Sequence, residues 1–220
     1  MLEDAAAQGI AIDVQSFIET EAIQSVEVQQ EIEQALLQSA PVVFTSMNAV
    51  EAVAAYVDEE KPDWTIYCMG QTTQQLVKKY FGEESIAGTG DNATDLAELV
   101  AEEAYADGVI FFCGDQRRDE LPGILRNNDI EVTEITVYHT IATPHAISKN
   151  YHGILFFSPS AVDSFFSTNK VNRPTMLFAI GNTTAAAIKK YTDAGIITAQ
   201  KPGKEKLVEK AINYFLNGER

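Results

Sequence analysis

Two similar stretches of this 220-residue sequence decide its fold: FTSMNAVEAV (residues 44–53) and FFSPSAVDSF (residues 156–165). In each stretch a short apolar run leads to a serine, and apolar residues at helical spacing follow. Ser46 in the first copy corresponds to Ser158 in the second, an offset of 112 residues. This order of residues predicts a buried parallel strand, an N-capping serine and a helix in each copy.

The repeat continues toward the C-terminus of each copy. IYCMGQTT (residues 66–73) resembles LFAIGNTT (residues 177–184), and Gly70 matches Gly181 at an offset of 111 residues. Leu96 matches Leu207 at the same offset. Strands that alternate with helices in a duplicated chain predict an α/β protein with two similar doubly wound domains, each built on a parallel sheet.

Turn signals and apolar runs give the expected elements. A Thr pair after Gly70 or Gly181 opens a helix, and we expect these two helices to end near Gly82 and Gly195. A further helix is expected over residues 118–127. The expected strands are residues 42–45, 64–69, 108–113, 154–157 and 176–180.

Two β-branched stretches lie outside these units: GIAIDVQSFI (residues 9–18) and IEVTEITVYHT (residues 130–140). They flank the first copy, so we interpret them as a two-strand β connector between the domains. One domain is then continuous over residues 18–142. The other domain is split between residues 1–17 and 143–220.

Composition excludes several classes of function. The net charge of −16 argues against a nucleic-acid partner and against binding to an acidic membrane surface. No apolar run is long enough for a membrane span and no signal peptide is recognisable, so we expect a cytoplasmic protein. Cys68 and Cys113 are predicted to be free, buried thiols. The three histidines lack metal-ligand spacing, so no metal site is expected.

The junctions between strands and helices carry the strongest functional signal. At the carboxyl ends of parallel strands, free backbone N–H groups favour anions. Small and hydroxylic residues occupy these positions, which suits a polyanionic ligand held by neutral donors. The alternative is that they only cap helices. The junctions are residues 46–48, 70–72, 114–116, 158–160 and 181–183.

Other signals are weaker. GTGDNA (residues 88–93) matches a dinucleotide-binding pattern, but we see no strand ahead of it and predict a loop with a helix cap at Asp91 or Asn92. Arg117 and Arg118 suit either a carboxylate contact or a solvated first helical turn. Tyr138 alternates with apolar neighbours, which by itself favours packing over acid chemistry.

Taken in order, the motifs FTSMNAVEAV, IYCMGQTT, FFCGDQRRDELPGIL, ITVYHTIATP, FFSPSAVDSFF and FAIGNTTAAAIKKY resemble the uroporphyrinogen-III synthase family. The resemblance extends from about Gly9 to the C-terminus. It implies two α/β domains joined by a two-strand β-ladder, with the active site in the cleft between them. It also implies a cyclising hydro-lyase of tetrapyrrole (haem) biosynthesis that needs no cofactor and closes hydroxymethylbilane to uroporphyrinogen III with inversion of ring D.

The resemblance also assigns roles to single residues. Tyr138 matches the tyrosine that is proposed to help the substrate hydroxyl leave. Arg118 matches a basic position, whereas Asn48 stands where some members carry arginine. The residues expected to contact the substrate are Ser46, Asn48, Gly70, Thr72, Thr73, Gly114, Arg118, Ser158, Ser160, Gly181 and Thr183.

Two departures from the family pattern are expected to matter. Members usually begin with an apolar strand, but this sequence starts within the helix that follows it, so either the split domain lacks its first strand or the given sequence has a shortened start. The charge of −16 opposes a polycarboxylate ligand, so we expect the acidic residues to lie away from the binding surface.

Two alternatives to the enzyme remain open at this point. The first is a non-catalytic two-lobed binding protein for a small anionic metabolite. The second is a nucleotide- or flavin-binding protein, which would rest on residues 88–93. Tyr138 favours the enzyme, because a binding protein has no need of that phenol. Since the connector requires only one chain, we expect a monomer.

Overall fold

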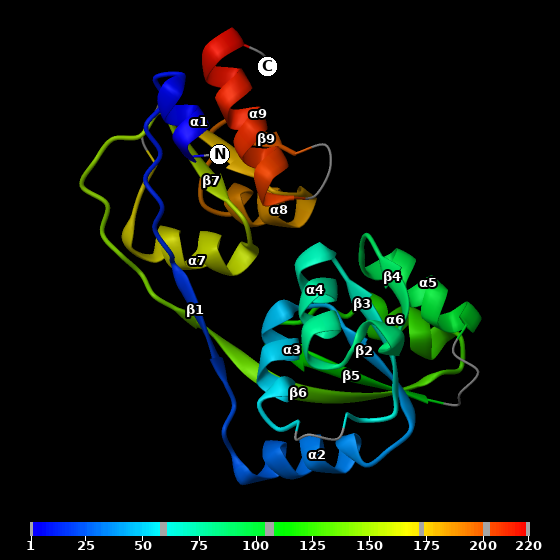
Figure 1. Cartoon of the computed structure of the whole chain (residues 1–220). Helices are drawn as coiled ribbons and strands as arrows, with labels where there is room; N and C mark the ends of the chain where they lie inside the picture. The colour runs from blue at the N-terminus through cyan, green and yellow to red at the C-terminus, as the bar shows by residue number, and fades with distance from the viewer. Residues whose placement is uncertain (1, 58–60, 104–107, 172–173, 200–202, 219–220) are drawn as a thin grey trace. The chain divides into compact units, whose positions relative to one another are not determined.

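The computed structural model describes residues 2–57, 61–103, 108–171, 174–199 and 203–218 (Figure 1). The chain divides into two compact units. Unit 1 comprises Met1–Glu19 together with Ile141–Arg220, and unit 2 comprises Thr20–Thr140. Unit 2 is therefore continuous in sequence, whereas unit 1 is assembled from both ends of the chain.

Unit 2 is built on a six-stranded sheet in the order β1-β6-β5-β2-β3-β4. The strands are β1 (Ile18–Ala22), β2 (Ala40–Phe44), β3 (Trp64–Met69), β4 (Ile86–Gly90), β5 (Gly108–Gly114) and β6 (Glu131–Ala142). From β6 to β4 each neighbouring pair is parallel. The carboxyl ends of these strands therefore lie along one edge of the sheet.

Helices cover both faces of this sheet. The helices are α2 (Val26–Leu36), α3 (Met47–Ala54), α4 (Gln71–Tyr80), α5 (Ala93–Glu103) and α6 (Glu120–Asn127), with a 3₁₀ turn at Glu83–Ser85. Phe44 of β2 packs into the cluster formed with α2, α3 and α4, whereas Val43 packs with α5 and α6. Consecutive strand residues thus point to opposite apolar layers, as expected for a buried parallel strand.

Unit 1 contains a three-stranded parallel sheet in the order β7-β8-β9. The elements are α1 (Leu2–Ala7), β7 (Gly153–Phe156), α7 (Pro159–Thr168), β8 (Met176–Ala179), α8 (Asn182–Lys189), β9 (Ile196–Thr198) and α9 (Lys204–Asn217). Leu177 of β8 packs with α7 and α8, whereas Phe178 packs with α9. The α/β prediction with parallel sheets is therefore confirmed.

The order of elements repeats between the units. The run β2-α3-β3-α4-β4-α5 of unit 2 has the same order as β7-α7-β8-α8-β9-α9 of unit 1. One difference is that β5 lies beside β2, whereas β7 is the edge strand of its sheet. No strand precedes α1 in the described part of the chain. Val43, on a strand with a neighbour on each side, is fully buried, while Leu155, its counterpart at an offset of 112 residues on the edge strand β7, is only partly buried.

The predicted strand over residues 9–18 is wrong for all but its last residue. Residues 10–16 have no regular structure, and the strand begins at Ile18. The backbone N–H of Thr143 donates to Phe17 O and that of Ile23 donates to Val137 O, both at 2.9 Å. The residue numbers in each pair add to the same value, so β1 and β6 are antiparallel. The chain passes from one unit to the other within these two strands.

Gly82 and Gly195 are both expected to lie at helix ends, but only Gly82 does so. Gly82 follows the end of α4 and adopts φ +102°, close to the expected helix end. Gly195 does not end α8, which stops at Lys189. The chain after α8 is held instead by local hydrogen bonds, including one from Ala194 N to Thr192 Oγ1 at 3.2 Å. A glycine cap is therefore not needed there.

The glycines of residues 88–93 serve packing. Gly88 and Gly90 lie within β4, so the motif contains a strand that the sequence prediction did not find. A Cβ on Gly90 would lie 2.7 Å from Leu96 N of α5, and one on Gly88 would lie 2.5 Å from Leu99. Asn92 Oδ1 accepts from Asp95 N at 3.0 Å, which is the predicted helix cap. These glycines bring α5 close to β4.

Candidate functional site

Two strand–helix junctions of unit 2 have counterparts in unit 1, and each lies at the carboxyl edge of its sheet. In unit 2, Ser46 follows β2 and Gly70 follows β3; in unit 1, Ser158 follows β7 and Gly181 follows β8. Each serine Oγ accepts a hydrogen bond from a backbone N–H of its own helix, at 3.2 and 3.1 Å. The glycines provide no such cap, so the first N–H groups of α4 and α8 are available to an anion.

Tyr138, the predicted catalytic residue, meets Ser46 within unit 2. Tyr138 is half-buried on β6, and β5 separates that strand from β2. The Tyr138 hydroxyl donates a hydrogen bond to Ser46 Oγ at 3.1 Å, although the two residues are 92 positions apart in sequence. Ser46 Oγ accepts this bond and the backbone bond of α3, so its own proton remains available to a ligand.

Gly114 makes room for the Tyr138 ring. A Cβ on Gly114 would lie 2.4 Å from Tyr138 Cζ and 2.7 Å from the phenolic oxygen. The pairing of β5 with β6 shifts register between Cys113 and Gly114, and this shift sets Gly114 opposite Tyr138. The sequence prediction made Gly114 a substrate contact. Since Gly114 is buried against the ring, we assign it to the placement of Tyr138 instead.

The Thr pairs divide into an exposed and a buried member. Thr72 and Thr183, at equivalent positions 111 residues apart, are both exposed at the start of α4 and α8. Thr73 and Thr184 are only 5% and 2% exposed and face the core, Thr73 on the same face of α4 as Val77. Thr73 is therefore the less accessible member of its pair, and its role as a substrate contact stays a prediction.

Asn48 and Ser160 complete the first turns of α3 and α7. Asn48 is half-buried, and its backbone N–H is the group that Ser46 Oγ caps. Ser160 is half-buried two residues after Ser158 and has polar partners of its own. Both residues therefore belong to the predicted junctions, one in each unit.

The two neighbouring arginines have different surroundings. Arg117 pairs with Asp119 and with Glu134 of β6, and Arg126 of α6 joins the same Glu134 at 2.6 Å. Arg118 is exposed, and no ion pair or hydrogen bond of its guanidinium is found among the described residues. Of the two, Arg118 is therefore the one available for a carboxylate.

The comparison with known proteins identifies the family. Residues 1–209 match the family described as uroporphyrinogen-III synthase HemD. This chain belongs to the uroporphyrinogen-III synthase family. The fold resembles that of uroporphyrinogen-III synthetase from Helicobacter pylori, with 18% identity, a TM-score of 0.68 and 90% of each chain covered. It also resembles a mutant uroporphyrinogen III synthase from Thermus thermophilus, with 16% identity, a TM-score of 0.66, and 98% and 93% of the two chains covered.

The cysteines of this member of the uroporphyrinogen-III synthase family are structural. Cys68 and Cys113 are free and buried, as predicted. Burial raises the pKa of the Cys68 thiol to about 11 and also raises the pKa of the Cys113 thiol. Both groups stay protonated near neutral pH, because a buried thiolate is disfavoured.

We therefore expect neither thiol of the native protein to react with Ellman's reagent at pH 8. Since the raised pKa favours the protonated form, reactivity appears only when the pH approaches the raised pKa or when the chain unfolds. In guanidinium chloride the same reagent should titrate both thiols. A full titration of the native protein within minutes would contradict the burial of both groups.

The described residues contain neither a cluster of metal-ligand side chains nor a membrane-spanning helix. Within the described ranges, no three or more His, Cys, Asp or Glu side chains cluster in a way that could hold a metal ion. His139 Nδ1 lies 3.4 Å from Asp115 Oδ2, but within the described ranges this pair is not part of a group of three or more such side chains. No helix of the described chain is long and apolar enough to cross a membrane.

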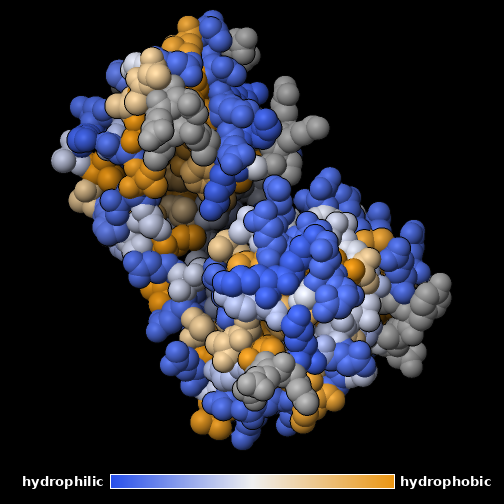
Figure 2. Space-filling model, viewed as in Figure 1, coloured by the Kyte–Doolittle hydropathy of each residue, from blue (hydrophilic) through white to orange (hydrophobic). Residues whose placement is uncertain are grey.

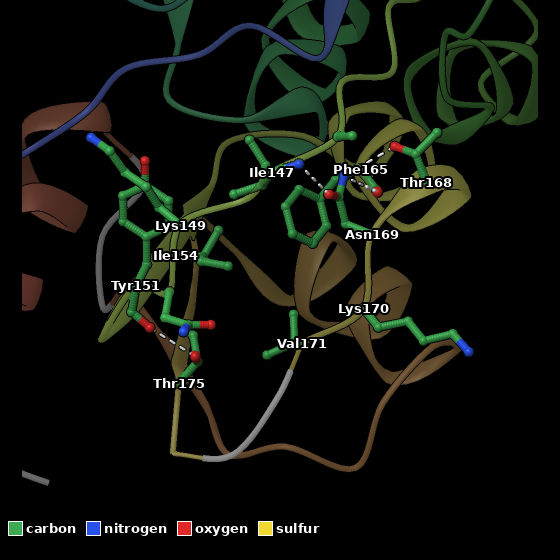
Figure 3. Close-up of a pocket in the computed structure, with 12 residues that line it drawn as sticks. Ile147, Lys149, Tyr151, Ile154, Phe165, Thr168, Asn169, Lys170, Val171 and Thr175 are labelled. Atoms are coloured by element: carbon green, nitrogen blue, oxygen red, sulfur yellow. Dashed lines mark hydrogen bonds between the residues drawn. The ribbon is translucent and has the colours of Figure 1, made fainter.

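A cavity of about 190 Å³ lies in unit 1 near the amino ends of β7 and β8 (Figure 3). Ile147, Ile154 and Phe165 provide apolar walls. Asn169 is satisfied by protein: its Oδ1 accepts from Ile147 N at 2.8 Å and its Nδ2 donates to Phe165 O at 2.9 Å. The predicted contacts of unit 1, Ser158 and Gly181, follow the opposite ends of these strands, so the cavity is separate from them.

Charge is divided unequally between the units. Unit 1 contains ten Lys+Arg and nine Asp+Glu, whereas unit 2 contains six Lys+Arg and 23 Asp+Glu. The face of the molecule in Figure 2 is largely hydrophilic, with scattered apolar patches. At the repeat offset of 111 residues, Asp95 near the start of α5 corresponds to Lys206 near the start of α9. The excess of acidic residues thus lies in unit 2, and the net charge of unit 1 is close to zero.

The sequence placed Asp115 in the junction at residues 114–116 but did not predict its contacts with β6. Asp115 follows Gly114 at the end of β5 and forms hydrogen bonds with β6 on both sides of His139. Nothing local to residues 114–116 indicates this role, because the bonding partners, Tyr138 and Thr140, lie 23 and 25 positions away in sequence.

Proposed function

We propose that this chain uses the Tyr138–Ser46 pair to convert hydroxymethylbilane to uroporphyrinogen III, the reaction of its family. The supporting observation is that the predicted acid, Tyr138, directs its hydroxyl to a capping serine at the carboxyl ends of parallel strands. Ligands of open α/β sheets bind at such ends. The reaction needs no cofactor, because the pyrrole rings of the substrate supply the electrons for ring closure.

The chemical step begins with departure of the substrate hydroxyl. Tyr138 donates a proton to that oxygen, water leaves, and an azafulvene forms. Ring D then attacks the azafulvene through its substituted carbon and gives a spiro intermediate, which rearranges and closes with ring D inverted. The substrate loses one proton as the pyrroles regain aromaticity, and this proton restores the phenol. The net change is loss of one water.

The junctions are proposed to bind the substrate carboxylates. The uncapped N–H groups at the start of α4 and α8, the hydroxyls of Thr72 and Thr183, and Arg118 are the donors that the two units offer. Unit 1 is close to neutral, so its junctions attract a polycarboxylate with little opposing charge. Binding of its carboxylates restricts the linear molecule to the geometry that gives the type III isomer.

Substitution of Thr72 or Thr183 by valine, which keeps the shape and removes the hydroxyl, is expected to raise KM. A hydrogen bond to a charged group contributes about 1.5–3 kcal/mol, so KM should rise about 10- to 150-fold while kcat changes little. Thr73→Val is the matched control, because Thr73 lies on the same helix but is buried. A larger KM effect from Thr73→Val than from Thr72→Val would reverse this assignment.

The activity itself is tested with freshly prepared hydroxymethylbilane. After oxidation, the uroporphyrin isomers I and III are separated; predominantly type III is expected, and type I at the rate of the buffer control would overturn the proposal. Neither the family match nor the structural neighbours favour a non-catalytic binding protein. We further propose that the chain works as a monomer in the cytoplasm, where free thiols such as Cys68 and Cys113 persist.

A further inference from the structure

The loop that follows β5 is bonded to the part of β6 that carries Tyr138. The backbone N–H of Asp115 donates to Tyr138 O at 3.1 Å. The Asp115 carboxylate accepts, through Oδ1, the backbone N–H of Thr140 at 2.9 Å. Gln116 adds a bond from its side-chain amide to Thr140 O at 3.3 Å. The loop therefore holds β6 at two residues, one of them Tyr138 itself.

These bonds begin where the regular ladder ends. β5 stops at Gly114, and its pairing with β6 is already shifted at that point. Beyond Gly114, the Asp115 backbone and carboxylate take over the hydrogen bonds that another strand residue would otherwise provide. β6 therefore keeps a defined course through residues 138–140, and the Tyr138 ring is held between that backbone and Gly114.

In the described structure, the Asp115 carboxylate forms no hydrogen bond with the Tyr138 hydroxyl, which bonds to Ser46. Its Oδ1 bonds to the Thr140 backbone, and its Oδ2 lies 3.4 Å from His139 Nδ1. An effect of this carboxylate on the Tyr138 hydroxyl therefore passes through the position of β6. Because misplacing a reacting group by about 1 Å can cost 100-fold in rate, such positioning is large enough to measure.

We propose that Asp115 is a positioning residue, whose carboxylate fixes β6 so that the Tyr138 hydroxyl lies at Ser46. This inference rests on the proposed function, in which Tyr138 donates the proton. Asparagine at position 115 retains the oxygen that accepts from Thr140 N, whereas alanine does not. The two substitutions therefore separate hydrogen bonding from charge.

The test compares Asp115→Ala, Asp115→Asn and Asp91→Ala in the full-length chain. Asp91 is an exposed aspartate in the loop after β4, so its replacement by alanine makes the same change in charge outside β5 and β6. We expect Asp115→Ala to lower kcat about 10- to 30-fold with KM changed less than about twofold, and Asp115→Asn to restore kcat to within about threefold of the unsubstituted protein. Asp91→Ala should match the unsubstituted protein.

A double substitution decides whether Asp115 acts through Tyr138. If it does, adding Asp115→Ala to Tyr138→Phe lowers kcat no further, because the phenol is already absent. Full additivity of the two effects, or equal losses in Asp115→Ala and Asp115→Asn, would overturn the positioning role while the synthase activity stands. An unsubstituted protein that yields only type I at the buffer rate would instead overturn the proposed function, and this inference with it.

Discussion

Tyr138→Phe is expected to lower kcat for uroporphyrinogen III formation about 100-fold, because positioned proton transfer contributes at least that much in many enzymes. This corresponds to about 2.7 kcal/mol of transition-state stabilisation. KM should change little, since the ring stays on Gly114 and only the hydroxyl that points to Ser46 is removed. The fraction of type I isomer should rise, because unassisted closure then competes with the slowed enzyme.

The matched control for this prediction is Tyr151→Phe. The Tyr151 hydroxyl also donates a hydrogen bond, to Asp13 Oδ2 at 2.7 Å, but in unit 1 and near the amino end of β7. Both variants lose one phenolic hydrogen bond, so the free energy of unfolding should fall by about 1 kcal/mol or less in each. Their melting temperatures should therefore fall by similarly small amounts. Unchanged type III formation by Tyr138→Phe would remove the proton-donor role while leaving the family assignment intact.

Gly114→Ala is expected to abolish most activity, although the substitution removes no proposed catalytic side chain. The added methyl would lie 2.4 Å from Tyr138 Cζ, so either the ring leaves Ser46 or the ends of β5 and β6 separate. Overpacking of this kind costs about 1–3 kcal/mol of stability, and displacement of the phenol should cost about as much activity as Tyr138→Phe. Steady-state kinetics and thermal unfolding measure the two effects separately.

Gly123→Ala provides the control for an added methyl group. Gly123 lies within α6, and apart from its chain neighbours and the nearby backbone of α6, no atom of the described residues lies within 4 Å of the position that its Cβ would take. Alanine there should keep full activity and stabilise the protein by up to about 1 kcal/mol, because alanine favours helices over glycine. If Gly114→Ala behaved like Gly123→Ala, the Tyr138 ring would not depend on the space that Gly114 provides.

Much of the fold could be predicted because its signals are local. The strand predicted over residues 64–69 is the strand observed, and Ser158 with Pro159 begins α7 as its sequence indicates. Parallel strands, capped helices and the internal repeat all follow from patterns a few residues long. The extended stretch at residues 9–17 was mispredicted because β-branched composition alone does not fix hydrogen-bonding partners.

The candidate site was only partly predictable, for two reasons. Thr72 and Thr73 are chemically equivalent, and the choice between them depends on which face of α4 packs; the spacing of Thr73 to Val77 was a usable signal that the sequence prediction did not apply. The roles of Gly114 and Asp115 had no such signal. They depend on how β5 meets β6, and therefore on contacts between residues some 25 positions apart.

The split of unit 1 determines the order in which the protein is completed during synthesis. Unit 2 has its full sequence once residue 140 has left the ribosome. Helix α1, whose Ala5 is fully buried, cannot pack into unit 1 until residues 141–220 have been synthesised. Their synthesis takes roughly 4–16 s at ordinary translation rates. The Tyr138–Ser46 pair is therefore encoded in the part that emerges first, whereas Ser158 and Gly181 emerge later. The nascent chain therefore has its proposed proton donor before it has the second half of its proposed substrate contacts.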